Sequence, residues 1–300
     1  MSDTDRSGQY FVCPLNQIFS FVIQASATIS LIPEAKGGPF IFWGDLESNC
    51  AKAATLGFHA IEIFPPSAED VDARVLKRLL ERHQFKLSGI GTGGGWVRHK
   101  LRLTDADPIV RGRARDFVKA IVDLAGGFGA PAIVGSMQGR FENDVTREQA
   151  LEWLREALEQ LGPRAQACGV PLLFEPLNRY ETNLINNVGA GLELIQSLRT
   201  RNVKLLADLF HMNIEETSMA TALQKGGKSI GHVHFVDSNR QAVGFGHTDI
   251  KPIADALGAI GYSGFLSAEA LPLPDSDTAA RQTMSAFKQF FSEEASNAQS

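Results

Sequence analysis

Cysteine, basic charge and long apolar runs are all scarce in this sequence of 300 residues, and each scarcity excludes a class of protein. The three cysteines, Cys13, Cys50 and Cys168, form no CxxC pair. This argues against a disulfide scaffold and favours a reducing compartment. The formal net charge of -5 provides no basic field to attract a nucleic acid. Nucleic acid is therefore not an expected partner.

The apolar runs also fall far below the ~18 residues that a helix needs to span a bilayer. Residues 1–9 lack the basic and apolar regions of a secretory signal. We therefore expect a cytoplasmic protein without a membrane partner. One domain is expected over residues 1–300, with an N-terminal extension at 1–15 and a frayed tail at 292–300.

What the sequence does contain is a series of short apolar runs separated by longer amphipathic segments. Their near-continuous apolar character is typical of parallel strands buried on both faces. The runs lie at 18–24, 59–64, 86–91, 131–136, 170–176, 203–210, 231–237 and 264–270.

The segments between the runs show helical spacing and helix start signals. Asp107 before Pro108 predicts an N-cap and a first helical position, and Thr146 predicts the start of another helix. Repeated strand–helix units without a Pro/Ser-rich linker predict an α/β fold, a (β/α)₈ TIM barrel. The alternative is an open doubly wound sheet with a small second domain.

Each of the last four runs carries one side chain of a metal-binding type at or near its C-terminal end. In a barrel these ends meet on one face, where active sites are found. Two glutamates, one aspartate and one histidine suit Mn²⁺, Co²⁺, Mg²⁺ or Zn²⁺, and the set lacks the thiolates of a structural zinc site. The four residues are Glu175, Asp208, His234 and Glu269.

Taken singly, a glutamate at a strand end is ordinarily ion-paired or solvated, and a histidine in a strand is ordinarily a hydrogen-bonded core residue. Repetition over four successive strands favours a metal site, because a divalent cation offsets the repulsion of carboxylates buried together. Glu181, His211 and Arg240 follow three of these strand ends, so they fall in loops of the same face. A polyol substrate needs such donors and acceptors. The alternative for Arg240 is a solvated loop residue.

These stretches resemble the sugar phosphate isomerase/epimerase superfamily, the xylose isomerase-like TIM barrels. FEPLNRYETN at 174–183 closely resembles the EPLNRYE signature of the D-tagatose 3-epimerase/D-psicose (allulose) 3-epimerase branch. The resemblance continues through ADLFHMNIEE, HVHFVDSNR and SAEAL. It implies an isomerase of carbohydrate metabolism that inverts C3 of a ketose through a cis-enediolate.

Carried over by residue, the resemblance implies that Glu175, Asp208, His234 and Glu269 bind a divalent metal, usually Mn²⁺ or Co²⁺ in the family. Glu175 and Glu269 would also be the catalytic acid/base pair.

For the substrate, the resemblance implies that Glu181, His211 and Arg240 hold its first hydroxyl and its carbonyl. Glu62, at the end of the second run, would support them. The family habit of pairing barrels implies a homodimer or a homotetramer.

Two loops depart from that branch. Residues 91–108 are rich in glycine and basic residues, and VGSMQGRF at 134–141 resembles a GxxQGR stretch of hydroxypyruvate-isomerase-like proteins. Both loops would contact the distal end of a substrate, and Trp96 is expected in the pocket or at a subunit contact. Their basic side chains would bind a phosphate or carboxylate, or form a solvated loop. They are Arg98, His99, Lys100, Arg102 and Arg140.

The alternatives to a 3-epimerase are an aldose–ketose or hydroxypyruvate-type isomerase, and a keto-sugar or inosose lyase or dehydratase on the same metal site. A DNA-repair endonuclease of the same superfamily is disfavoured by the acidic charge and by the four-ligand set. A non-catalytic sugar-binding barrel would be expected to have lost a ligand, and none is lost here.

Overall fold

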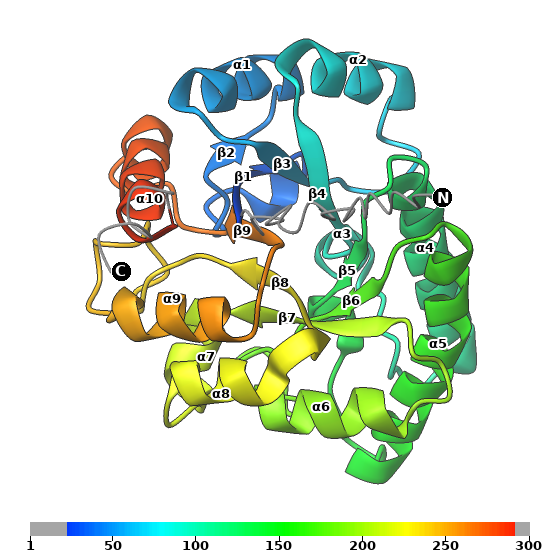
Figure 1. The fold of residues 1–300 in the computed structure, drawn as a ribbon. Helices are drawn as coiled ribbons and strands as arrows, with labels where there is room; N and C mark the ends of the chain where they lie inside the picture. The colour runs from blue at the N-terminus through cyan, green and yellow to red at the C-terminus, as the bar shows by residue number, and fades with distance from the viewer. Residues whose placement is uncertain (1–22, 292–300) are drawn as a thin grey trace, which may run out of the picture.

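The computed structural model describes residues 23–291, in which eight parallel strands close into a barrel surrounded by helices (Figure 1). The strands pair in chain order, and the last pairs with the first to complete the ring. They are β1 (Gln24–Ser30), β3 (Ala60–Phe64), β4 (Lys86–Gly91), β5 (Ala132–Val134), β6 (Leu172–Phe174), β7 (Val203–Asp208), β8 (Ile230–His234) and β9 (Phe265–Ala268). The short strand β2 (Phe42–Trp43) pairs only with β1. The TIM barrel is confirmed, and the doubly wound sheet is wrong.

The apolar runs predicted the first strand at the wrong position in the sequence. It begins at Gln24, whereas the prediction put it at 18–24, most of which lies outside the described residues. Ser26, Thr28 and Ser30 alternate along β1 and are fully buried. Ser26 shares a 2.6 Å hydrogen bond with Ser88, and Thr28 donates to the carbonyl of Ala268 at 2.6 Å. A strand whose buried polar groups are satisfied by other strands of the barrel shows no apolar run.

The helices form the outer layer of the barrel (Figure 1). The α-helices are α1 (Leu46–Leu56), α2 (Ala73–His83), α3 (Gly94–His99), α4 (Pro108–Gly126), α5 (Arg147–Ala167), α6 (Val188–Ser197), α7 (Leu209–Glu215), α8 (Met219–Gly226), α9 (Ile250–Ala259) and α10 (Ser276–Phe291). Short 3₁₀ turns are η1 (Pro33–Ala35), η2 (Ser136–Gln138) and η3 (Gly227–Ser229). The predicted starts of α4 and α5 are confirmed: Asp107 caps α4, and Thr146 forms a reciprocal capping box with Gln149.

The main apolar core lies between the strands and the helices. Because side chains alternate along a strand, a residue between two members of this core points into the barrel. Leu173 is such a residue, and with Ile133 and Leu206 it forms a separate buried cluster. The same alternation turns Glu62, between Ile61 and Ile63, into the barrel interior.

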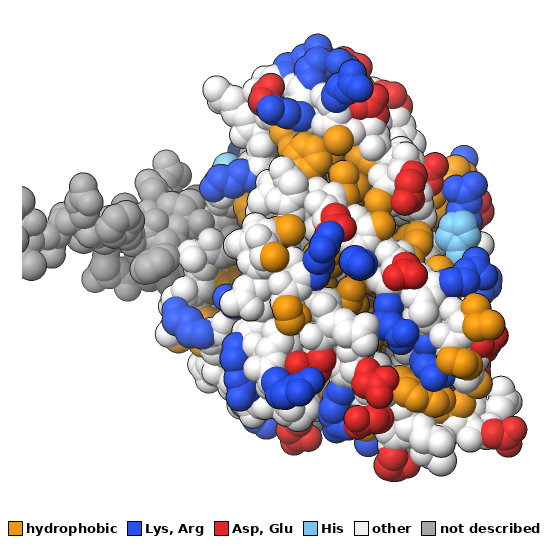
Figure 2. Space-filling model, turned by 90° about the vertical axis from the view of Figure 1, so that its right-hand side faces the viewer, with side chains coloured by type: hydrophobic (Ala, Val, Ile, Leu, Met, Phe, Trp, Pro, Cys, Tyr) orange, Lys and Arg blue, Asp and Glu red, His pale blue; other side chains and the backbone are white. Residues whose placement is uncertain are grey.

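The surface has mixed charge on the face shown in Figure 2, where Lys and Arg are interspersed with Asp and Glu. Within residues 23–291, no helix combines the length and the apolar character required to cross a membrane. Cys50 and Cys168 are free thiols. Cys13, the predicted N-terminal extension and the predicted tail lie outside the described residues.

Candidate active site

Four side chains from four neighbouring strands converge at the C-terminal end of the barrel. Glu175 follows β6, Asp208 and His234 end β7 and β8, and Glu269 follows β9. One ligand atom of each residue lies within 4.8 Å of those of the other three, and all four residues are buried. The structure therefore brings together the whole set that the sequence singled out.

The imidazole of His234 lies among three carboxylates that it cannot balance. Its Nδ1 is 3.2 Å from Asp208, 3.3 Å from Glu175 and 3.4 Å from Glu269. One ring N–H donates to one acceptor, and an imidazolium carries one positive charge against three negative ones. Buried carboxylates in this arrangement are stabilised either by protonation or by a further cation.

The pKa shifts in the cluster reflect the same imbalance. Burial raises the pKa of Glu175 above its ordinary value. Burial acts to lower the pKa of His234, but the carboxylates of Glu269 and Glu62 outweigh it and hold that pKa well above its usual range. Burial acts to raise the pKa of Asp208, and nearby imidazoles lower it below its usual range. Without a metal, the positive charge of protonated His234 thus partly balances the carboxylates that a divalent cation would neutralise.

The donor set fits such a cation. Carboxylate oxygens and one imidazole nitrogen suit Mn²⁺, Co²⁺, Mg²⁺ or Zn²⁺. Glu175 Oε1 is buried and has no hydrogen-bond partner among the described residues, although His234 lies close to it. A buried oxygen without a donor is expected where a metal ion binds.

Glu62 lies beneath His234 and does not contact the cavity. Its carboxylate is 0% exposed, with one oxygen 3.1 Å from His234 Nε2 and the other 2.6 Å from His232 Nε2. This contact holds the Nε2 proton on the Glu62 side and leaves Nδ1 facing the three carboxylates. From the sequence, we expected Glu62 to support the substrate. The structure instead places it against His234, where it can orient that imidazole. The sequence reasoning missed His232, although two histidines two apart in one strand must share a face.

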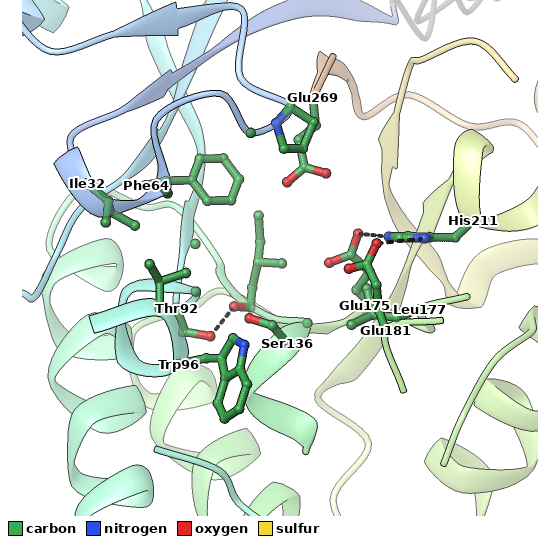
Figure 3. Close-up of a pocket in the computed structure, with 18 of the residues that line it drawn as sticks. Ile32, Phe64, Thr92, Trp96, Ser136, Glu175, Leu177, Glu181, His211 and Glu269 are labelled. Atoms are coloured by element: carbon green, nitrogen blue, oxygen red, sulfur yellow. Dashed lines mark hydrogen bonds and ion pairs between the residues drawn. The ribbon is translucent and has the colours of Figure 1, made fainter. Parts of the chain in front are cut away.

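His211 is held so that one nitrogen faces the cavity. The backbone N–H of Asn178 lies 3.3 Å from Nδ1, and the side-chain amide lies 2.7 Å from it. Because a backbone N–H can only donate, Nδ1 accepts and Nε2 carries the proton. Nε2 lies 3.9 Å from Glu175, with no hydrogen-bond partner in the described residues (Figure 3). It can donate to a substrate oxygen there.

Arg240 joins two carboxylates at the mouth of the cluster. Its guanidinium lies 2.8 Å from Glu181 and 3.5 Å from Glu269, and it stacks 4.8 Å from the ring centre of Phe210. Its backbone has a φ of 62°. Asp237 fixes the loop. Its carboxylate accepts hydrogen bonds from three backbone N–H groups, and its backbone carbonyl accepts one from the backbone N–H of Arg240. This is not the environment of a solvated loop residue.

One cavity of about 490 Å³ is lined by Glu175, Glu181, His211, Arg240 and Glu269, whereas Asp208 and His234 are not among its lining residues. Figure 3 shows Glu175, Glu269 and His211 around one part of it, with Trp96 and Ser136 on the side away from Glu269. The two loops that depart from the epimerase branch therefore do contribute to the wall, and Trp96 lies in the pocket as expected. Sequence reasoning missed the apolar part of the wall, formed by Ile32, Phe40 and Phe64. Nothing in the local pattern separates those residues from the core.

Comparison with known proteins is consistent with this fold and site. The family model described as "Xylose isomerase-like TIM barrel" matches residues 50–290, so the chain belongs to that family. A D-psicose 3-epimerase of Ruminiclostridium cellulolyticum is 31% identical over 227 residues, covering 73% of this chain and 76% of that protein. A 3-dehydro-D-guloside 4-epimerase of Escherichia coli is 34% identical over 216 residues, covering 66% and 79%.

A solved structure of an L-ribulose 3-epimerase is 25% identical, covers 93% of this chain and 97% of its own, and has a TM-score of 0.76. A D-allulose 3-epimerase from Methylomonas sp., 22% identical with a TM-score of 0.77 and coverage of 90% and 98%, has the same fold. The curated relatives are epimerases, and this chain is an enzyme of the isomerase class.

Proposed function

We propose that the protein is a divalent-metal-dependent sugar epimerase that transfers a proton at C3 of a ketose. The observation that carries the proposal is the pair Glu175 and Glu269, which follow β6 and β9. Both residues line the cavity, and His211 lies beside Glu175 (Figure 3). Inversion needs one group on each face of the carbon, and two glutamates on separate strands meet that need. Relatives named D-psicose, L-ribulose and ketose 3-epimerases support the substrate class.

Glu175, Asp208, His234 and Glu269 would hold the cation, which supplies Lewis-acid stabilisation of negative charge on substrate oxygens. One glutamate removes the C3 proton to give a cis-enediolate, and the other returns a proton to the opposite face. In the absence of a metal, burial raises the pKa of Glu175 above its ordinary value, which favours a carboxylate that can accept a proton.

Three other residues would orient the sugar. His211 Nε2–H donates to an oxygen beside Glu175, since no group within residues 23–291 uses that proton. Arg240 and Glu181, joined at 2.8 Å, bind a hydroxyl between a donor and an acceptor. On the sequence grounds given above, we also propose that Mn²⁺ is the resident ion. The proposal further includes a cytoplasmic location and assembly into a homodimer or a homotetramer.

Deuterium exchange tests this function. Mn²⁺-loaded protein is incubated in D₂O with free ketohexoses and ketopentoses, and label is located by NMR after the metal is removed. Label at C3 with inversion supports the proposal. Label at C1 or C2 instead makes the protein an aldose–ketose isomerase, and loss of a substituent makes it a lyase or dehydratase.

A second candidate is epimerisation at C4 of a 3-keto-glycoside. It is favoured by the departure of the 91–108 and 134–141 loops from the ketose 3-epimerase branch, and by the relative named a 3-dehydro-D-guloside 4-epimerase. The same two glutamates would act beside a ring ketone. The discriminating result is label at C4 of a 3-keto-glycoside with no label in any free ketose.

Arg240→Ala is expected to raise KM or lower kcat about 10-fold or more while the metal stays bound, because a charged hydrogen bond to substrate is lost. Steady-state kinetics and metal content are measured on the same preparation. Arg98→Ala is the control, since that guanidinium forms ion pairs with Glu34 and Asp70 and does not line the cavity. Full activity of Arg240→Ala would remove Arg240 from the substrate site.

Gly135→Ala is expected to weaken metal binding at least about 10-fold, although Gly135 is not a ligand. A Cβ there would lie 2.3 Å from Glu175 Oε2, so the carboxylate has to shift from its present position in the cluster. Metal affinity is measured by titration of chelator-treated protein. In the control Gly112→Ala, the added Cβ meets only the flexible end of Arg115 at 4.0 Å. Equal affinity of the two variants would show that Glu175 does not need its present position to bind metal.

A further inference from the structure

The loops at 91–108 and 134–141 carry several basic side chains. The structure shows which of these side chains line the cavity and which do not. Arg98 contacts two exposed carboxylates and does not line the cavity. His99 and Lys100 are exposed and do not line it either. Arg102 and Arg140 remain as the basic residues of these loops in the cavity wall.

Arg102 and Arg140 differ in charge balance. Arg102 lies 3.0 Å from Asp105 and also pairs with Glu142, so two carboxylates already neutralise it. The guanidinium of Arg140 makes no hydrogen bond and no ion pair with any residue in the range 23–291. It is half-buried in the wall of a cavity. A guanidinium without protein partners in a cavity wall has all of its N–H donors available for a ligand.

The backbone that carries Arg140 is fixed on both sides. Its carbonyl accepts from Thr104 Oγ1 at 3.3 Å, and the preceding carbonyl, of Gly139, accepts from Thr182 at 2.7 Å. The next residue, Phe141, exchanges two hydrogen bonds of 3.0 and 2.9 Å with the side-chain amide of Asn183. A side chain on a fixed backbone loses less entropy when it binds a ligand.

A second polar side chain from the same loop lines this cavity. It is Ser136, whose hydroxyl makes no hydrogen bond with the described residues. Trp96 and Ser136 lie on the side of the cavity away from Glu269 (Figure 3). A substrate whose ketone lies at the acid/base pair would therefore extend its other end towards this wall.

We infer that the substrate carries an anionic group, a carboxylate or a phosphate, at the end remote from its ketone, and that Arg140 with Ser136 binds it. This inference rests on the proposed function, since it takes the ketone to lie between Glu175 and Glu269. Arg fits the geometry of carboxylate and phosphate oxygens with two parallel hydrogen bonds. A hydroxyl of a neutral sugar can accept a hydrogen bond from Arg140, but it carries no charge to neutralise the guanidinium.

The test compares three ketoses of equal chain length: a neutral one, one with a terminal phosphate and one with a terminal carboxylate. Mn²⁺-loaded wild type should show a kcat/KM at least ~10-fold higher for one of the two anionic sugars, which identifies the anion. Arg140→Met should lose about 10- to 100-fold with that sugar, the loss expected for a hydrogen bond to a charged group. The same variant should change less than about 2-fold with the neutral ketose.

Arg98→Met, on the same loop system but outside the cavity, should behave as wild type with all three sugars. Equal losses of Arg140→Met with charged and neutral sugars would overturn the anion site. So would equal kcat/KM of the wild type for all three.

A readout without turnover separates this inference from the proposed function. Inorganic phosphate should raise the melting temperature of Mn²⁺-loaded wild type and Arg98→Met, and raise that of Arg140→Met much less. If that pattern is found and no ketose exchanges label, the anion site stands and the epimerase proposal fails. If phosphate stabilises all three proteins equally while a neutral ketose is epimerised, the epimerase stands and the anion site fails.

Discussion

Glu175→Gln and Glu269→Gln are each expected to lower kcat for epimerisation by about 10²–10⁴-fold, the usual contribution of a positioned acid or base. Glutamine has nearly the shape of glutamate and keeps one oxygen for a metal, but it can neither take nor give the C3 proton. The measurement is turnover of the substrate found by deuterium exchange. Metal content is determined beside it, because both residues also belong to the metal-binding set.

The two variants should differ when each C3 epimer is offered separately in D₂O. If each glutamate serves one face of C3, each variant retains its proton-removing group for only one epimer. One epimer should then exchange its C3 proton slowly without inversion, and the other should not exchange. Glu156→Gln, an exposed position on α5, is the control and should be fully active. An active Glu175 or Glu269 variant with normal inversion would exclude that residue from proton transfer.

Removing the metal is expected to abolish turnover and to destabilise the fold. Without the ion, the single imidazole of His234 faces the carboxylates of Glu175, Asp208 and Glu269 at 3.2 to 3.4 Å. Reloading at 100 times Kd should raise the free energy of unfolding by about 2.7 kcal/mol, the value that linkage gives for one site. The melting temperature should rise by several degrees, because a few kcal/mol shift it by that much in a domain of this size.

Calorimetry of chelator-treated and Mn²⁺-reloaded protein provides this measurement, with elemental analysis for stoichiometry. In His234→Asn the metal should give little or no stabilisation, whereas the control His99→Asn changes an exposed residue of α3 and should behave as wild type. Reloaded protein that contains no stoichiometric divalent ion, or that melts at the same temperature with and without it, would contradict the metal site.

The sequence by itself determined the barrel and the cluster of four candidate ligands. The apolar runs from 59 onward match strands β3 to β9, and the caps Asp107 and Thr146 start their helices as predicted. The cluster followed from one physical fact. In a closed parallel sheet all C-terminal ends lie on one face, so side chains that follow strand ends meet there.

Only the tertiary structure decided what each polar residue contacts. Strand β1 was misplaced because its polar residues Ser26 and Thr28 are buried and bonded to β4 and β9, which no local pattern records. From the sequence, Glu62 was assigned to the substrate site, yet its carboxylate contacts His234. Its two neighbours in β3 face the outer core, so Glu62 points into the barrel interior. Arg102 and Arg140 look alike in sequence, but in the described part of the chain only Arg102 pairs with carboxylates. Charge pairing depends on distances between residues that are brought together by folding, and the order of residues along the chain does not contain those distances.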